Sequence, residues 1–126
     1  MALKRVVVTG LGALTPIGNN IDDFWQGLAN GKSGGAPITY FDTSKFKTNF
    51  ACELKHFNIS DFLDRKEQRR MDKFTQYAMV STEEAINDSG LDLDSIDKLR
   101  VGVIWGSGIG GIETFQNEIL NFAAGD

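Results

Sequence analysis

The stretch VVVTGLGALTPIG, residues 6–18, joins three consecutive valines to a turn with two closely spaced glycines. A valine run that ends in Thr-Gly-x-Gly is typical of the strand and phosphate-binding turn of nucleotide-binding domains. Here, however, Leu14 stands where that turn needs another glycine, and Pro16 lacks the backbone N–H that a phosphate would bind. We therefore interpret the stretch as a buried strand, residues 4–9, followed by a glycine-tolerant turn.

A second valine-rich run, VGVIWGSGIGG at residues 101–111, also ends in glycines. The pattern predicts a buried strand over residues 100–105, then a loop, then a helix over residues 112–122. The loop satisfies G-x-G-x-x-G, although a single match of this kind is a weak signal. The acidic residue expected about 20 residues further on cannot be checked in this sequence. A dinucleotide-binding oxidoreductase domain therefore remains an alternative.

Helix signals fill most of the remaining chain. Cap residues at 19–23 precede an apolar stripe that ends at ANGKSGG, and residues 60–89 form a long helical region that Gly90 stops. A weak strand is predicted over residues 50–54. Strands alternating with helices define an α/β class, but two valine-rich strands make a thin sheet. We expect the front portion of a larger α/β protein.

Composition narrows the function classes. The 126 residues are 41% hydrophobic, with a formal net charge of −4 that argues against general nucleic-acid binding. No apolar run approaches the length of a membrane span, and the N-terminal residues lack the features of an export signal. A single cysteine forms no internal disulfide, which fits a reducing cytoplasm.

Three motifs, taken in order and spacing, resemble a known family. RVVVTGLGALTPIGN, RKEQRRMDKFTQYA and GSGIGG are similar to the N-terminal part of the elongating β-ketoacyl-acyl carrier protein synthases, most closely the synthase II type of fatty-acid synthesis. The resemblance spans residues 1–126 and implies a thiolase-like layered α/β fold, here only part of the N-terminal half, continuing beyond residue 126. It also implies a cytoplasmic homodimer that works with an acidic acyl carrier protein.

The activity implied by the resemblance is that of an acyltransferase performing decarboxylative Claisen condensation. The family's nucleophilic cysteine lies in a Thr-Ala-Cys type motif, and its two histidines lie in His-Gly-Thr and Gly-His contexts. None of these motifs occurs in the 126 residues, so we expect no catalytic residue here and no activity of the segment alone. The resemblance implies no metal or redox cofactor, because phosphopantetheine arrives on the carrier protein.

Cys52 and His56 are the cysteine and the histidine that the sequence does contain. On an extended segment, residues four apart lie roughly 13 Å from each other, too far for proton transfer. We interpret Cys52 as structural or incidental and His56 as a surface or loop residue.

A positive cluster stands out on this negative chain: five of its thirteen Lys and Arg residues lie within nine positions, Arg65, Lys66, Arg69, Arg70 and Lys73. On a continuous helix the last four span an arc of roughly 100°, while Met71, Phe74, Ala78 and Ala85 cluster on another face. A solvated helix face is one interpretation. The resemblance implies the other, in which Lys66, Arg69 and Arg70 dock the carrier protein.

Ile109 lies in the second glycine loop. The resemblance implies that its side chain projects into the acyl-chain pocket and limits the pocket's depth, with core packing as the alternative. The loop glycines are expected to serve the backbone path rather than chemistry: Gly106, Gly108, Gly110 and Gly111. A second alternative for the whole protein is a non-catalytic partner subunit of a condensing pair, which keeps the fold and loses the cysteine.

Overall fold

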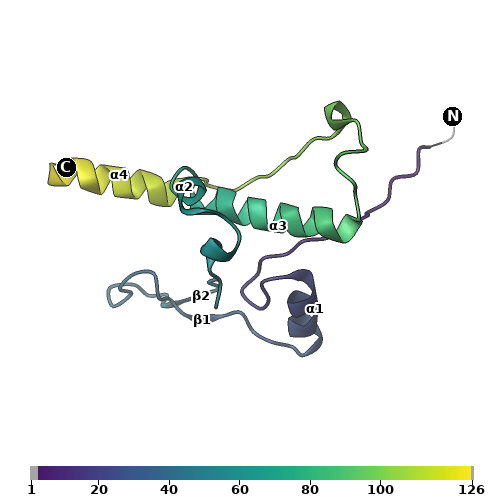
Figure 1. The fold of residues 1–126 in the computed structure, drawn as a ribbon. Helices are drawn as coiled ribbons and strands as arrows, with labels where there is room; N and C mark the ends of the chain where they lie inside the picture. Colours follow the sequence, from purple (N-terminus) through teal and green to yellow (C-terminus); the bar gives the residue numbers. More distant parts are fainter. Residues whose placement is uncertain (1–2, 126) are drawn as a thin grey trace. The chain divides into compact units, whose positions relative to one another are not determined.

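The computed structural model describes residues 3–125, which form two compact units. The first unit comprises residues up to Phe57 together with Ser81–Leu91, and the second comprises Asn58–Val80 together with residues from Asp92 onward. Helix α3, Lys73–Ser89, contributes its first half to the second unit and its second half to the first. Figure 1 labels the helices and strands of both units.

The first unit contains helix α1, Ile21–Ala29, and two short strands, β1 at Ala36–Pro37 and β2 at Phe50–Ala51. Asn20 caps α1 by accepting a hydrogen bond from the backbone N–H of Asp23 at 2.7 Å, as the cap signals predict. The strands pair antiparallel, with Ala36 opposite Ala51. The predicted helix and the weak strand prediction are therefore both confirmed, although β2 is shorter than expected.

The glycine turn of residues 10–13 packs against the second half of α3. The backbone N–H of Leu11 donates to Asp88 at 2.8 Å, and that of Ala13 donates to Glu84 at 2.8 Å. A Cβ atom on Gly12 would lie 2.0 Å from the carbonyl oxygen of Ser81, so only glycine permits this approach. Helix packing thus accounts for the glycines, in agreement with the interpretation that they form no phosphate site.

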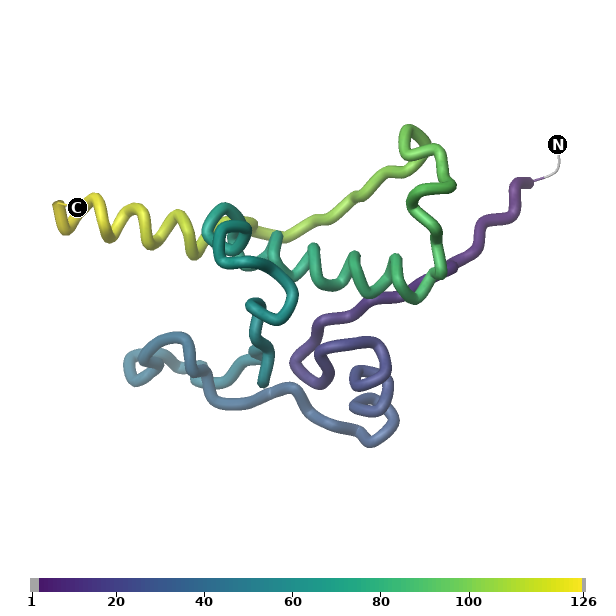
Figure 2. The backbone as a smooth tube through the Cα atoms, in the orientation of Figure 1, coloured from purple at the N-terminus to yellow at the C-terminus, as the bar shows by residue number. Residues whose placement is uncertain are grey.

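The two confident strand predictions are wrong for this structure. Neither stretch forms a strand: Figure 2 shows residues 4–9 and 101–105 as uncoiled chain, and Arg100 ends a short 3₁₀ helix. Val6 is 90% exposed and Ile104 is 99% exposed. A strand needs a hydrogen-bonded neighbour, and among residues 3–125 the only paired strands are β1 and β2. Valine-rich composition signals burial in a sheet, but it does not supply the neighbouring strands.

The second unit is built from short helical pieces. Its elements are η1 at Ile59–Asp61, α2 at Arg65–Gln68, the start of α3, η2 at Lys98–Arg100 and α4 at Ile112–Ala124. The helical region predicted over residues 60–89 is confirmed in outline, but it breaks between Gln68 and Lys73. The continuous helix assumed for the positive cluster is therefore wrong, because Arg69 and Arg70 lie after the end of α2.

Few apolar side chains are buried within residues 3–125. Among the described residues, the buried hydrophobic side chains are Leu63, 8% exposed, and Val80, 4% exposed. The predicted apolar face of α4, which includes Phe115 and Phe122, is exposed to solvent. No helix within residues 3–125 combines the length and apolar character needed to cross a membrane.

The packing of the glycine turn predicts that Gly12→Ala destabilises the protein. The new methyl group collides with the backbone of α3, which cannot move aside as a flexible side chain can, and such overpacking costs about 1–3 kcal/mol. Differential scanning calorimetry of the full-length protein should show a Tm lower by several degrees. Gly35→Ala is the matched control, since its Cβ would make only an ordinary 3.5 Å contact with Ser33. Equal Tm values for the two variants would contradict the packing described here.

Candidate functional site: a basic segment joined to a glycine loop

Residues 65–73, here called the basic segment, begin with a well-defined cap. Asp64 accepts hydrogen bonds from the backbone N–H groups of Lys66 and Glu67, both at 2.8 Å, and Glu67 bonds back to the N–H of Asp64 at 3.4 Å. This reciprocal capping box starts α2, although the helix lasts only one turn. The positive side chains follow on a fixed backbone and are all exposed: Arg65, Lys66, Arg69, Arg70 and Lys73.

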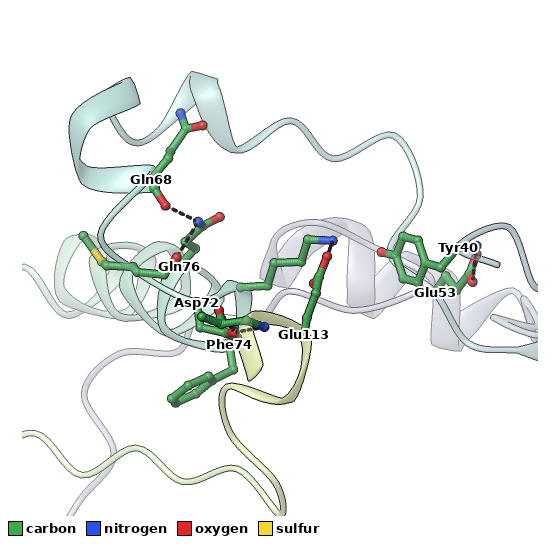
Figure 3. A network of polar contacts seen from close by, with 10 residues as sticks. Tyr40, Glu53, Gln68, Asp72, Phe74, Gln76 and Glu113 are labelled. Carbon is green, nitrogen blue, oxygen red and sulfur yellow. Dashed lines mark hydrogen bonds and ion pairs between the residues drawn. The ribbon is translucent and has the colours of Figure 1, made fainter. Parts of the chain in front are cut away.

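Two glutamine amides hold the turn that follows α2. The side-chain Nε2 of Gln76, on the buried face of α3, donates to the carbonyls of Gln68 at 2.9 Å and Met71 at 3.0 Å. The Nε2 of Gln68 in turn donates to the carbonyl of Leu63 at 2.7 Å. Figure 3 shows Gln76 reaching the backbone of Gln68. These bonds, here called the glutamine bridge, pair the carbonyls of Leu63 before α2, of Gln68 at its end and of Met71 after it, and thereby hold the turn that carries Arg69 and Arg70.

The positive charges of the basic segment differ in their partners. Lys73 forms an ion pair with Glu113 at 2.8 Å, with both side chains about half exposed. Within residues 3–125, the other four cations form no ion pair: Arg65, Lys66, Arg69 and Arg70. Their charges are therefore not neutralised by neighbouring carboxylates, and they can attract an acidic surface.

The glycine loop, residues 106–111, leads into α4. Gly111 has a φ of 71°, in the left-handed region, and it supplies no side chain to cap the helix. A Cβ atom on Gly110 would lie 3.0 Å from the ring of Phe74, so this residue closely approaches α3. Ile109 is 72% exposed, so its side chain is not packed into a core of the described residues. Gly106 and Gly108 have open space where a Cβ would stand, so their structural role stays a prediction.

Asp72 joins the basic segment to the glycine loop. Its carboxylate accepts a 2.6 Å hydrogen bond from the hydroxyl of Thr114 and a longer one, 3.4 Å, from the Thr114 backbone N–H. The other carboxylate oxygen accepts from the N–H of Phe74 at 3.3 Å (Figure 3). The Thr114 hydroxyl, helped by these N–H groups and by Lys73, lowers the pKa of Asp72 below its ordinary value of 3.8. Since the folded pKa is depressed, the stability gained is present at neutral pH and is lost as the pH falls through that lowered pKa.

Cys52 and His56 are not brought together as a reactive pair. Both are exposed, and in the part of the chain that the structure describes no hydrogen bond links the thiol to the imidazole. His56 has a φ of 54°, and the Asn19 amide donates to its carbonyl at 3.3 Å. The geometry agrees with a structural or incidental role for Cys52 and a loop position for His56.

A cavity of about 500 Å³ lies in the first unit, between the turn at residues 15–18 and one side of α1. Two lysines line it, but each already donates to a backbone carbonyl: Lys32 to Ile17 at 3.2 Å and Lys55 to Gly34 at 2.9 Å. Their ammonium groups thus hold loops in place, and we assign no chemistry to the cavity.

Sequence reasoning missed Asp72, Thr114 and Gln76. An aspartate immediately before a run of periodically spaced apolar residues is a helix-start signal, so the sequence could have predicted a role for Asp72 at the start of α3. Its partner Thr114 lies 42 residues away, and no local pattern connects the two. The glutamine bridge depends on the break after α2, which the continuous helical periodicity hides.

Comparison with known proteins defines the class. Residues 3–124 match the family model described as beta-ketoacyl synthase, N-terminal domain. The chain is 48% identical over 115 residues to 3-oxoacyl-[acyl-carrier-protein] synthase 2 of Synechocystis sp., covering 91% of this chain and 28% of the relative. It therefore spans less than a third of the length of the curated relative it matches.

Solved structures show the same fold. The ishigamide ketosynthase/chain length factor is 32% identical, with a TM-score of 0.82 over 99% of this chain and 31% of that chain. A type II PKS acyl-carrier protein in complex with its ketosynthase bound to the hexaketide is 27% identical, with a TM-score of 0.76 over 96% of this chain and 31% of that one.

This chain belongs to the β-ketoacyl synthase family and matches its N-terminal domain. The predicted fold class, part of the N-terminal half of a thiolase-like α/β fold, is confirmed by the likeness to ketosynthases. The family assignment replaces the alternative of a dinucleotide-binding oxidoreductase. GSGIGG then needs no nucleotide to account for it; its last glycine, Gly111, directly precedes helix α4.

The glutamine bridge predicts that Gln76→Ala destabilises the turn that carries Arg69 and Arg70. The substitution removes the donor from two part-buried carbonyls; leaving a buried acceptor unsatisfied costs about 1–3 kcal/mol, and partial exposure lowers that cost. Hydrogen–deuterium exchange of the full-length protein should become faster in peptides covering residues 66–73. Asn87→Ala, at an exposed position of the same helix, is the control. Unchanged exchange in Gln76→Ala would show that the bridge does not hold the turn.

Proposed function

We propose that the full-length protein is a β-ketoacyl-acyl carrier protein synthase of the synthase II type, acting in cytoplasmic fatty-acid biosynthesis as a homodimer. The observation that carries the proposal is the 48% identity over 91% of this chain with a 3-oxoacyl-[acyl-carrier-protein] synthase 2. Identity to a synthase also favours an enzyme over the alternative of a non-catalytic partner subunit.

The proposed reaction has two steps. A cysteine thiolate of the full-length enzyme attacks the acyl thioester, and the phosphopantetheine thiol of the carrier protein leaves. Malonyl-carrier protein then loses CO₂, and the resulting carbanion attacks the acyl-enzyme thioester, releasing the cysteine. The product is a β-ketoacyl chain two carbons longer. The chemistry draws on the thioesters themselves, so the proposal includes no metal or redox cofactor.

Within that reaction, the basic segment is the proposed docking surface for the acyl carrier protein. Lys66 lies on α2, and Arg69 and Arg70 stand on the turn held by the glutamine bridge; within residues 3–125 none of the three forms an ion pair. They are concentrated on a chain whose formal net charge is −4. A local positive patch on a negative chain steers an acidic partner toward one place and opposes docking elsewhere.

The glycine loop is the proposed second contribution. Ile109 is a branched apolar side chain presented by a loop and 72% exposed among the described residues. An acyl chain is the apolar ligand that such a side chain can limit in length. Gly110 and Gly111 let the backbone pass close to Phe74 and turn into α4, which leaves Ile109 as the side chain that sets the available volume.

Docking through charge predicts that the double reversal Arg69→Glu/Arg70→Glu slows carrier association with the full-length enzyme. Long-range attraction raises association rates more than it raises final affinity, so we expect a loss of about tenfold or more at low ionic strength. The difference should shrink at high salt, where the Debye length falls to a few ångströms. Stopped-flow association with acyl carrier protein across a salt series measures both effects.

The matched control for this reversal is Lys45→Glu/Lys47→Glu, which changes the net charge equally at exposed positions outside the basic segment. The proposal requires that the control retain most of its association rate at low salt. Equal losses in the two double variants would mean that only net charge matters. A wild-type association rate for the Arg69→Glu/Arg70→Glu variant at low salt would contradict the proposal that the basic segment docks the carrier protein.

The pocket role predicts that Ile109→Phe selectively reduces elongation of long acyl primers, because the larger ring fills space that the distal carbons need. We expect kcat/KM to fall by about tenfold or more for long primers and to change little for short ones. Ile109→Leu, which conserves volume, is the control and should behave like the wild type. Steady-state condensation with a series of acyl-carrier proteins provides the data. A uniform loss across chain lengths would contradict the pocket role.

A further inference from the structure

We propose that Asp72 and Thr114 form a positioning pair that fixes the end of the glycine loop and thereby sets where Ile109 acts on the acyl chain. This inference rests on the proposed function, because it concerns the chain-length selectivity of that same site. The parts that it connects all lie within the second unit.

The first step concerns the start of α4. Gly111 precedes the helix and has no side chain, so no local cap satisfies the first backbone N–H groups. Asp72 supplies an acceptor from another element: it binds the N–H of Thr114 at 3.4 Å and, more strongly, the Thr114 hydroxyl at 2.6 Å. A carboxylate at a helix N-terminus is also favoured by the helix dipole.

The second step concerns the start of α3. The opposite oxygen of Asp72 accepts from the N–H of Phe74 at 3.3 Å. A single carboxylate therefore bonds to groups at the first turns of two helices. The Phe74 ring lies where a Cβ on Gly110 would come within 3.0 Å, so α3 also contacts the loop directly. Figure 3 shows Asp72, Phe74 and Glu113 gathered at this junction.

The third step is that the loop has few other attachments among the described residues. A Cβ atom added to Gly106 or Gly108 would meet no atom within 4 Å, and Ile109 is mostly exposed. The backbone direction at Ile109 is therefore set from its C-terminal side, by the contact at Gly110 and the bonds at Thr114. Loosening those bonds lets the loop end shift and displaces the side chain that limits the pocket.

The neighbouring Lys73–Glu113 ion pair also joins the start of α3 to the start of α4, but it is a weaker candidate for fixing the glycine loop. Both side chains are about half exposed, and exposed ion pairs contribute little to stability. The Thr114 hydroxyl bond is also exposed, but its acceptor Asp72 in addition binds the backbone N–H groups of Thr114 and Phe74, so it holds the backbone directly, whereas the ion pair joins two side chains. The two interactions can be separated by substitution, since each has its own residue on α4.

The test compares Thr114→Val, which removes only the hydroxyl at nearly constant shape, with Thr114→Ser, which retains it. Both are made in the full-length enzyme, and kcat/KM is measured for long and short acyl primers on carrier protein. We compare the ratio of kcat/KM for long primers to kcat/KM for short primers. In Thr114→Val we expect this ratio to move toward one by about fivefold or more, since a bond to a charged group is lost. Thr114→Ser should restore the wild-type ratio, and Glu113→Gln should leave it unchanged.

Each outcome bears on a separate claim. Wild-type enzyme that fails to condense acyl and malonyl groups on carrier protein overturns the proposed function and this inference with it. Active wild-type enzyme and an unchanged ratio in Thr114→Val overturn the inference alone. A ratio shifted as much by Glu113→Gln assigns the role to the ion pair and also overturns it. Should Thr114→Val unfold, Asp72→Asn replaces it, with the same shift in ratio expected and an unchanged ratio again contradicting the inference.

Discussion

The carboxylate of Asp72 is the constraint on which the second unit depends. It accepts hydrogen bonds from Phe74 at the start of α3 and from Thr114 at the start of α4, so one side chain sets the spacing of two helix ends. Arg69 and Arg70 lie three and two residues before it in the sequence, and the glycine loop ends three residues before its partner Thr114. A charged surface and an apolar loop are thereby built on a common support.

That support gives physical meaning to the two proposed roles of this N-terminal domain. Carrier recognition needs cations that are exposed, uncompensated and fixed in position, and the glutamine bridge provides the fixing. Chain-length control needs a side chain whose backbone cannot drift. Local polar bonds hold both the basic segment and the glycine loop, because the described residues bury little apolar surface that could hold them by packing.

Several features of this chain could be predicted from the sequence because their causes are local. Asn20 caps α1, Gly90 ends α3 with a φ of 63°, and the apolar spacing from Ile112 onward marks α4. The three family motifs identified the class. Strand pairing was not predictable, since valines at residues 6–8 report a preference for burial but not the presence of a neighbour. The break after α2 and the Asp72–Thr114 bond were missed because periodicity continues through the break and the bond spans 42 residues.

The most direct measurement is hydrogen–deuterium exchange of the full-length protein with and without acyl carrier protein. If the basic segment docks the carrier and shares its support with the glycine loop, carrier binding should slow exchange at residues 65–73 and also at residues 106–114. Slower exchange confined to other parts of the protein, with both of these segments unchanged, would contradict this assignment.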